Sequence, residues 1–166
     1  MNLLIIGAGS FSTEVEELAM LLGYDDIAFL DDNPDKALSH PVIGTINDIE
    51  KYCGRYDNAI VALGNNKSRM DYHNILESFG FNIPVLIHPT AYVSPDAMLA
   101  QGCIVRTFAV VGRFAELGKA VILNIGAKVD HHCVIGDGSH LLINSVVRAS
   151  KSVKPLTWLD AGQVIQ

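Results

Sequence analysis

The chain has 166 residues, of which 49% are hydrophobic and 18% charged, and its formal net charge is −6. This length suits one medium domain or two small ones with a buried core, and the acidic balance argues against nucleic acid as the main partner. No apolar run reaches the roughly 20 residues of a membrane helix, and the N-terminus lacks the features of a signal peptide. Three cysteines do not suggest a disulfide framework. We therefore expect a cytoplasmic protein that does not associate with membranes.

The first half of the chain alternates short apolar runs with amphipathic stretches. The apolar runs predict buried parallel strands at residues 2–7, 26–32, 58–64 and 84–89. A loop with Pro41 and Gly44 follows the second strand. The amphipathic stretches predict helices with three apolar faces: Phe11, Val15, Leu18 and Leu22; Ile46, Ile49 and Cys53; and Tyr72, Ile75, Leu76 and Phe79. This βαβαβαβ order predicts a small Rossmann-like α/β domain with a parallel sheet and crossover helices.

Candidate ligand-binding residues follow the predicted strands. Parallel sheets of this kind bind ligands at the C-terminal ends of their strands. Glycines there let a ligand phosphate approach a helix N-terminus, and a carboxylate can accept a hydrogen bond from a ribose or base. Ser12 stands where the third glycine of a dinucleotide fingerprint would be, so tight turns without a ligand remain an alternative. The candidates are Gly7 and Gly9 of "GAGS", Asp31 and Asp32 of "LDD", and Gly64, Asn65 and Asn66 of "LGNN".

The charge balance changes near His88. Residues 1–88 have 5 Lys/Arg against 13 Asp/Glu, a net charge of −8, whereas residues 89–166 have 7 against 5, a net charge of +2. The sequence pattern changes at the same place. We therefore predict two domains, 1–88 and 89–166.

The second domain has a repeat of six residues. From Ala91 onward, each hexad has an aliphatic third residue, no insertion interrupts the series, and most first residues are small. Six-residue repeats of this kind indicate a parallel β-helix, in which the aliphatic column forms the core. The column consists of Val93, Leu99, Val105, Val111, Leu117, Leu123, Val129, Ile135, Leu141, Val147, Val153, Leu159 and Ile165.

The segment "KVDHHCVIGDGSH" (128–140) gathers three histidines, one cysteine and two aspartates. Cys133 is a first-position residue, so we expect it to pack inside the coil. His131 and His132 occupy the fifth and sixth positions, where adjacent side chains are expected to point apart, which disfavours a metal site. A solvated turn and a catalytic histidine both remain open.

The hexad column, together with "FLDD", "LGNN", "LIHPTA" and "DHHCVIG" in this order and spacing, resembles one family of hexapeptide-repeat enzymes over nearly the whole chain. These are the sugar acetyltransferases of the sialic-acid O-acetyltransferase and UDP-4-amino-sugar N-acetyltransferase type. The resemblance implies a left-handed β-helix with about eighteen residues per coil. It also implies acetyl transfer from acetyl-CoA to the amino or hydroxyl group of a nucleotide-linked sugar in bacterial surface-glycan synthesis.

The same resemblance implies a set of roles. His131 corresponds to the general base, which takes a proton from the attacking amine or hydroxyl. The coenzyme-binding candidates are Asn124, His140, Arg148 and Ala149, with Lys151 and Lys154 as either phosphate contacts or a solvated basic edge. The family forms homotrimers that share the acyl-CoA groove, and trimer formation would cover exposed apolar residues such as Phe108, Val110 and Phe114.

Three features depart from the family pattern. His132 replaces the acidic residue that usually follows the base, Ser10-Phe11-Ser12 replaces a Gly-His-Gly turn, and the sequence ends about two coils early. One alternative is therefore a non-catalytic relative that binds a sugar nucleotide and has a degenerate acyl-CoA site. A second alternative is a dinucleotide-dependent enzyme using "GAGS" and Asp31. Turnover of acetyl-CoA would exclude the first, and NAD binding without binding of a UDP-sugar would favour the second.

Overall fold

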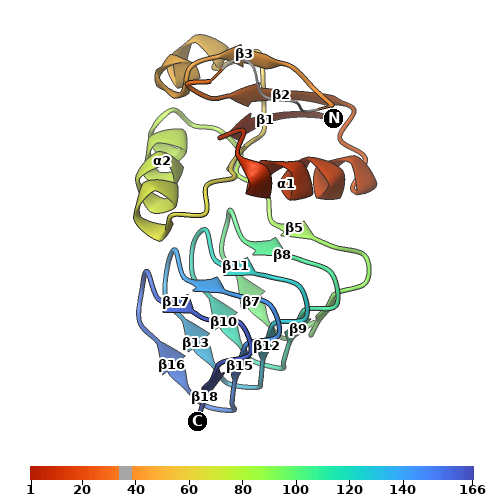
Figure 1. The fold of residues 1–166 in the computed structure, drawn as a ribbon, viewed down its shortest axis with the longest axis vertical. Coiled ribbons are helices and arrows are strands. Elements are labelled where there is room, and N and C mark those ends of the chain that lie inside the picture. The colour runs from red at the N-terminus through yellow and green to blue at the C-terminus, as the bar shows by residue number, and fades with distance from the viewer. Residues whose placement is uncertain (34–38) are drawn as a thin grey trace. The chain divides into compact units, whose positions relative to one another are not determined.

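The computed structural model describes residues 1–33 and 39–166, which form two compact units, Met1–Pro84 and Val85–Gln166 (Figure 1). We call them the N-terminal unit and the C-terminal unit. The division follows Pro84 rather than His88, where the sequence analysis placed it. The reason is strand β5 (Leu86–Ile87), which pairs with β8 (Ile104–Val105) in the C-terminal unit and does not join the N-terminal sheet.

The sheet of the N-terminal unit is parallel and has the strand order β3-β2-β1-β4. Three of its strands lie where the apolar runs predicted them, but β3 was predicted as a loop because of Pro41 and Gly44. Since β3 is an edge strand, a neighbouring proline removes no ladder bond that the sheet needs. The strand bounds are β1 (Asn2–Ile6), β2 (Asp26–Leu30), β3 (Val42–Gly44) and β4 (Ala59–Val61).

The helices of this unit are α1 (Ser10–Leu21), the 3₁₀ helix η1 (Ile46–Tyr52) and α2 (Asn66–Ser78). Val15 and Leu18 of α1 are buried, as predicted. The predicted face of α2 was right for Leu76, which is buried, and for Tyr72, which packs against the core, but wrong for Ile75 and Phe79, which are exposed. Arg69 and His73 are buried instead. The helix is turned so that the Arg69 guanidinium donates to the carbonyls of Leu63 and Gly64.

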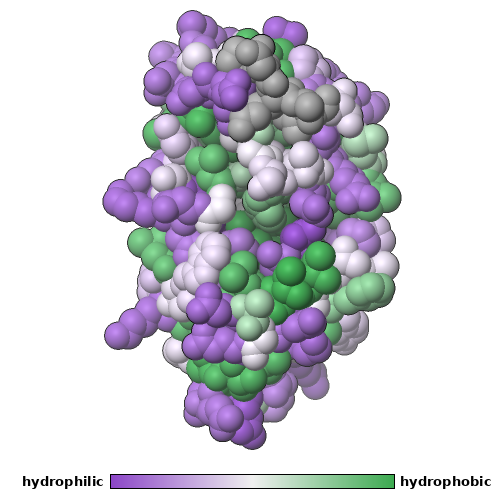
Figure 2. Space-filling model, viewed as in Figure 1, coloured by the Kyte–Doolittle hydropathy of each residue, from purple (hydrophilic) through white to green (hydrophobic). Residues whose placement is uncertain are grey.

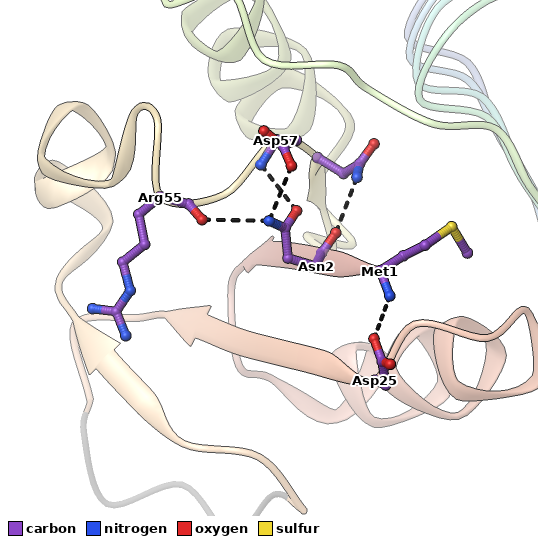
Figure 3. A network of polar contacts seen from close by, with 6 residues as sticks. Met1, Asn2, Asp25, Arg55 and Asp57 are labelled. Carbon is purple, nitrogen blue, oxygen red and sulfur yellow. Dashed lines mark hydrogen bonds and ion pairs between the residues drawn. The ribbon is translucent and has the colours of Figure 1, made fainter.

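Side-chain hydrogen bonds hold the start of β1 beside the segment that leads to β4 (Figure 3). Asn2 Nδ2 donates to the carbonyl oxygen of Arg55 (3.3 Å) and to Asp57 Oδ2 (3.2 Å), and the Asp57 N–H donates to Asn2 Oδ1 (2.9 Å). The Met1 ammonium group contacts the Asp25 carboxylate and lowers the pKa of Asp25 below its ordinary value. These contacts support the sheet at the end opposite the "GAGS" turn.

The C-terminal unit is a parallel β-helix of two-residue strands. Ile122 pairs with His140 and Glu116 pairs with Val134, so one coil contains eighteen residues, as the resemblance implied. The strands stack into three sheets with the orders β16-β13-β10-β7, β17-β14-β11-β8-β5 and β18-β15-β12-β9-β6. The remaining bounds are β6 (Tyr92–Val93), β7 (Met98–Leu99), β9 (Val110–Val111), β10 (Glu116–Leu117), β11 (Ile122–Leu123), β12 (Lys128–Val129), β13 (Val134–Ile135), β14 (His140–Leu141), β15 (Val146–Val147), β16 (Ser152–Val153), β17 (Trp158–Leu159) and β18 (Val164–Ile165).

The predicted aliphatic column forms the core of this unit. Every third-position residue from Val93 to Ile165 belongs to one hydrophobic cluster, and those of the middle coils are fully buried. Cys103 and Cys133, which are first-position residues, lie in the same cluster, as predicted for Cys133. Burying one such aliphatic side chain contributes about 1.5–3 kcal/mol, so the column stabilises the coils independently of the outer residues.

The corners of the coils have a backbone conformation that the sequence analysis did not predict. From Gly102 to Gly162, every sixth-position residue has a positive φ, including His132 at 57° and Phe114 at 58°. Left-handed backbone is uncommon for residues other than glycine, although histidine, asparagine and aspartate adopt it more readily than most. His132 therefore sits on a left-handed turn directly after His131.

Candidate active site

The N-terminal unit brings the "GAGS" and "LDD" segments together at the ends of β1 and β2. Asp31 Oδ2 accepts a hydrogen bond from the Ala8 N–H (2.7 Å), and Asp31 Oδ1 accepts one from the Asn33 N–H (2.9 Å). Gly7 has a φ of 98°, and a Cβ there would lie 2.6 Å from Leu63 Cδ2. The site thus requires glycine at position 7, while the Asp31 carboxylate retains lone pairs that can accept from a ligand.

Two other predicted residues lie beside this edge. Gly9 is the N-cap of α1 and has no side-chain cap, and a Cβ there would meet nothing within 4 Å. Asp32 is exposed, and its Oδ1 accepts from the Ile46 N–H (3.3 Å) at the start of η1. The space at Gly9 and the exposure of Asp32 are compatible with a ligand at the strand ends.

The "LGNN" residues form the turn from β4 into α2. Asn65 Oδ1 caps α2 by accepting from the Ser68 N–H (2.9 Å), and Asn66 Oδ1 accepts from Arg69 Nη2 (2.8 Å). Arg69 Nη1 donates to the carbonyl oxygen of Gly64 (3.2 Å). The three predicted residues therefore support the loop, and two of them, Gly64 and Asn66, do so by binding Arg69. The sequence analysis missed Arg69 because it belongs to no apolar periodic pattern.

Ser12 explains the incomplete glycine fingerprint. Its side chain is fully buried, and its Oγ donates to the carbonyl oxygen of Ala62 (3.2 Å) just after β4. A small hydroxyl thus joins α1 to the sheet at the position where a third glycine would allow close packing.

His131 lies on an exposed corner of the C-terminal unit after β12. Its N–H donates to Asp130 Oδ1 (2.7 Å), and its carbonyl oxygen accepts from the Ser150 N–H (2.9 Å) of the next coil. His131 Nδ1 and His132 Nδ1 are 3.0 Å apart, with the rings nearly perpendicular at 89°. The expectation that the two rings point apart was wrong, because His132 has the left-handed backbone of the corner.

The preceding coil approaches the backbone of His131 closely. A Cβ on Gly112 would lie 2.7 Å from the backbone nitrogen of His131. Glycine at this position therefore lets two coils stack at van der Waals distance beneath the exposed histidine.

The four predicted coenzyme-binding residues lie in different surroundings. Arg148 is exposed, and Ala149 follows it one coil after His131, at the same corner. Asn124 lies at another corner, where its Oδ1 accepts from Arg106 Nη1 (2.6 Å). His140 lies in β14, is only 4% exposed, and packs its ring against Trp158 at a centroid distance of 4.9 Å. The structure thus brings Arg148 and Ala149 to the His131 corner, and it buries His140.

Other features do not indicate a site. Among residues 1–33 and 39–166, no group of three or more His, Cys, Asp or Glu side chains is arranged to hold a metal ion. No helix in that described part is long and apolar enough to cross a membrane. A hollow of about 870 Å³ runs along α1, but it contains none of the predicted site residues, and its lining is Thr13, Glu14, Glu16, Glu17, Met20, Leu21 and Ser39.

Comparisons with known proteins agree with this architecture. The family model described as the PglD N-terminal domain matches residues 2–76. GDP-perosamine N-acetyltransferase of Escherichia coli O157:H7 is 29% identical over 176 residues, which cover 100% of this chain and 79% of that protein.

Several solved structures match nearly the full chain, and those of two proteins illustrate the match. The acetyltransferase domain of PglB from Neisseria gonorrhoeae is 35% identical, with a TM-score of 0.89 and coverage of 99% of this chain and 91% of that one. It has also been solved in complex with acetyl coenzyme A. PerB from Caulobacter crescentus, in complex with CoA and GDP-perosamine, is 25% identical, with a TM-score of 0.86 and coverage of 100% and 89%. The fold is a Rossmann-like parallel sheet followed by a left-handed parallel β-helix, as predicted.

Proposed function

The chain belongs to the hexapeptide-repeat sugar acetyltransferases, and from this premise we propose that it transfers the acetyl group of acetyl-CoA to the amino group of a nucleotide-linked sugar. The observation that carries the proposal is the exposed imidazole of His131 at a corner of the β-helix. An amine is favoured over a hydroxyl as the acceptor because one relative is named an N-acetyltransferase and another was solved with an amino sugar, GDP-perosamine. The product would enter bacterial surface-glycan synthesis.

His131 is proposed as the general base. The amine nitrogen bonds to the thioester carbonyl carbon, and His131 takes the proton that the nitrogen must lose. The C–S bond then breaks, and the CoA thiolate leaves and takes up a proton, which the imidazolium can supply. The thioester is already activated, so this reaction requires no nucleophile from the protein.

The N-terminal unit is proposed to bind the nucleotide. Gly7 and Gly9 allow phosphate oxygens to approach the N-terminus of α1, which attracts anions. Asp31 and Asp32 offer carboxylate oxygens to ribose or base donors, and "LGNN" forms the adjacent turn. Contacts of this kind fit a nucleotide without requiring NAD.

The C-terminal unit is proposed to bind acetyl-CoA. Arg148, Lys151 and Lys154 are exposed and supply the cations that coenzyme phosphates require. Ala149 leaves space one coil beyond His131. Asn124 lies at a corner in the preceding hexad, whereas the buried ring of His140 suits support of β14 better than direct contact with the coenzyme.

We further propose that the enzyme acts as a cytoplasmic homotrimer. Phe108 is 64% exposed and Phe114 is 44% exposed, and apolar surface interrupts the polar surface in the view of Figure 2. Exposed apolar groups of this kind favour association. Cys53, Cys103 and Cys133 are free thiols, which suits a reducing compartment. Light scattering is expected to give three times the chain mass, and a monomer at micromolar concentration would contradict the trimer.

A thiol-release assay tests the proposed activity. Acetyl-CoA is mixed with a panel of UDP-, CMP- and GDP-linked amino sugars, including GDP-perosamine, and the matching 4-hydroxy sugars serve as controls. We expect thiol release with at least one amino sugar and none with its hydroxy counterpart. Binding of a sugar nucleotide without thiol release would instead indicate a binding module, and binding of NAD alone would indicate a dinucleotide-dependent protein.

A further inference from the structure

Within the described part of the chain, the His131 ring has a single polar contact, and that contact is with its neighbour His132. The two Nδ1 atoms are 3.0 Å apart. Asp130, the carboxylate next in sequence, binds the backbone N–H of His131 rather than the imidazole. The position of His132 therefore decides what the His131 ring nitrogen meets.

The His132 ring is held by a series of contacts through three successive coils. It lies 5.0 Å from the Phe114 ring, and the Arg113 guanidinium carbon lies 4.6 Å from the centroid of the same phenyl ring. Arg113 Nε in turn donates to Asp96 Oδ2 (2.6 Å). The backbone of His132 is also fixed, because its N–H donates to the Arg113 carbonyl oxygen (3.0 Å). The His132 side chain is exposed, as that of His131 is, but these contacts support its ring.

The chemistry of the Nδ1 contact has one productive arrangement for a base at His131. A neutral imidazole has one N–H, so two Nδ1 atoms can bond only if one donates and the other accepts. When His131 donates, its Nε2 keeps a lone pair and can take the proton of the substrate amine. The imidazolium that forms then donates a charge-assisted hydrogen bond to His132 Nδ1.

We infer that His132 is a positioning residue that fixes His131 in the tautomer with the proton on Nδ1. The inference rests on the proposed function, since it assigns His132 a role in that same reaction. His132 occupies the place where the family has an acidic residue, and it supplies a neutral nitrogen as the acceptor. The bond made by one ring nitrogen sets the protonation of the other, so removing His132 Nδ1 releases the tautomer.

The test compares two substitutions of His132. His132→Phe removes the nitrogen and keeps a ring, and phenylalanine fits this corner because Phe114 has a φ of 58° at the same position one coil earlier. We expect kcat to fall about 10- to 100-fold, with KM for both substrates unchanged, because the acceptor of a charge-assisted hydrogen bond is lost. His132→Asp provides a carboxylate acceptor on a residue that tolerates left-handed backbone, and should restore kcat to within about threefold.

A measurement that does not depend on turnover accompanies the kinetics. Nitrogen-15 shifts of the His131 ring at pH 8, above the usual imidazole pKa of about 6.5, report which nitrogen has the proton. We expect Nδ1–H in the wild type and in His132→Asp, and a shift toward Nε2–H in His132→Phe. An unchanged tautomer in His132→Phe would overturn the inference.

The outcomes separate this inference from the proposed function. Full activity in His132→Phe together with a large loss in His131→Ala would overturn the positioning role and leave the acetyltransferase intact. A larger loss at His132 than at His131 would also overturn it, since His132 would then be the base. A wild type without turnover on any sugar would count against the proposed function, while the tautomer measurement would still decide the histidine pair.

Discussion

The two units use their polar side chains differently. In the N-terminal unit, the candidate ligand-binding residues also hold the fold: Asp31 accepts from the Ala8 N–H, Asn65 caps α2, and Asn66 binds Arg69. In the C-terminal unit, His131 lies on an exposed corner outside a core made of the aliphatic column. The fold and the candidate chemistry therefore share residues in the first unit and are separate at the His131 corner of the second.

This difference explains where the sequence can depart from its family. A corner residue such as His132 can replace an acidic residue because it lies outside the core cluster of the coils. In the N-terminal unit, Asp31, Asn65 and Asn66 can change only if their hydrogen bonds within the fold are replaced. Substitutions at the His131 corner should therefore alter activity alone, whereas substitutions of the candidate residues in the N-terminal unit should alter stability together with binding.

The largest effect is expected for His131→Ala. Loss of the general base should lower kcat by about 10²- to 10⁴-fold. The thermal midpoint should stay within about 2 °C of the wild type, because an exposed corner residue contributes little packing. Ala149 shows that alanine fits this corner one coil later, and Ile143→Ala, at an exposed fifth position of another corner, is the control. A large drop in the thermal midpoint would show that His131 also stabilises the fold, and would contradict the proposed difference between the two units.

Arg69→Met should give the next largest effect, on stability. The Arg69 side chain is fully buried and donates to Leu63 O (2.9 Å), Gly64 O and Asn66 Oδ1. Methionine would leave these acceptors without their donor, so the free energy of unfolding should fall by about 2–4 kcal/mol in urea titration. Lys67→Met, which removes only an exposed pair with Asp71, should cost less than about 0.5 kcal/mol. Equal losses would show that burial does not set the cost.

The fold of the C-terminal unit could be predicted almost completely from sequence. Its period depends on one requirement, an aliphatic residue at the third position of each hexad. That requirement can be read directly from the amino-acid sequence. The boundary was misplaced because the apolar run at 84–89 suits either unit, and only pairing assigns β5 to the coil. Strand β3 was missed because an edge strand can lie beside Pro41 and include Gly44.

The contact between the His131 and His132 rings could not be predicted from the alternation of side chains along a strand. Adjacent residues point apart on a strand, but the sixth position of each hexad has left-handed backbone, and this brings the two rings together. A signal for this geometry was present in the sequence, because Gly102, Gly126, Gly138 and Gly162 share that position with Asn144. Glycine and asparagine are the residues that adopt such a backbone most readily.

Asp31→Ala should combine the two kinds of effect. Affinity for the sugar nucleotide should fall by about 1.5–3 kcal/mol, because a charge-assisted hydrogen bond is lost. Stability should also fall by about 1 kcal/mol, since the Ala8 and Asn33 N–H groups lose their acceptors. Calorimetric titration and urea unfolding measure the two terms, with Asp71→Ala as an exposed control. Loss of affinity with unchanged stability would show that Asp31 serves binding without stabilising the fold, as is expected of His131 for activity.

The smallest effect is expected at an exposed contact of the N-terminal unit, the capping box that starts η1. Asp48 accepts from Lys51 Nζ and from the N–H and hydroxyl of Thr45, and chiefly the Lys51 bond lowers the pKa of Asp48 from 3.8 to about 2. Because the folded pKa lies below the unfolded one, the stabilisation is present above about pH 4 and is lost as the pH falls toward 2. Asp48→Asn should therefore lower the unfolding midpoint slightly at pH 7 and not at pH 2, and Lys51→Met should reduce this pH dependence. A loss at pH 7 as large as that of Arg69→Met would show that exposed polar contacts in this unit stabilise as much as buried ones.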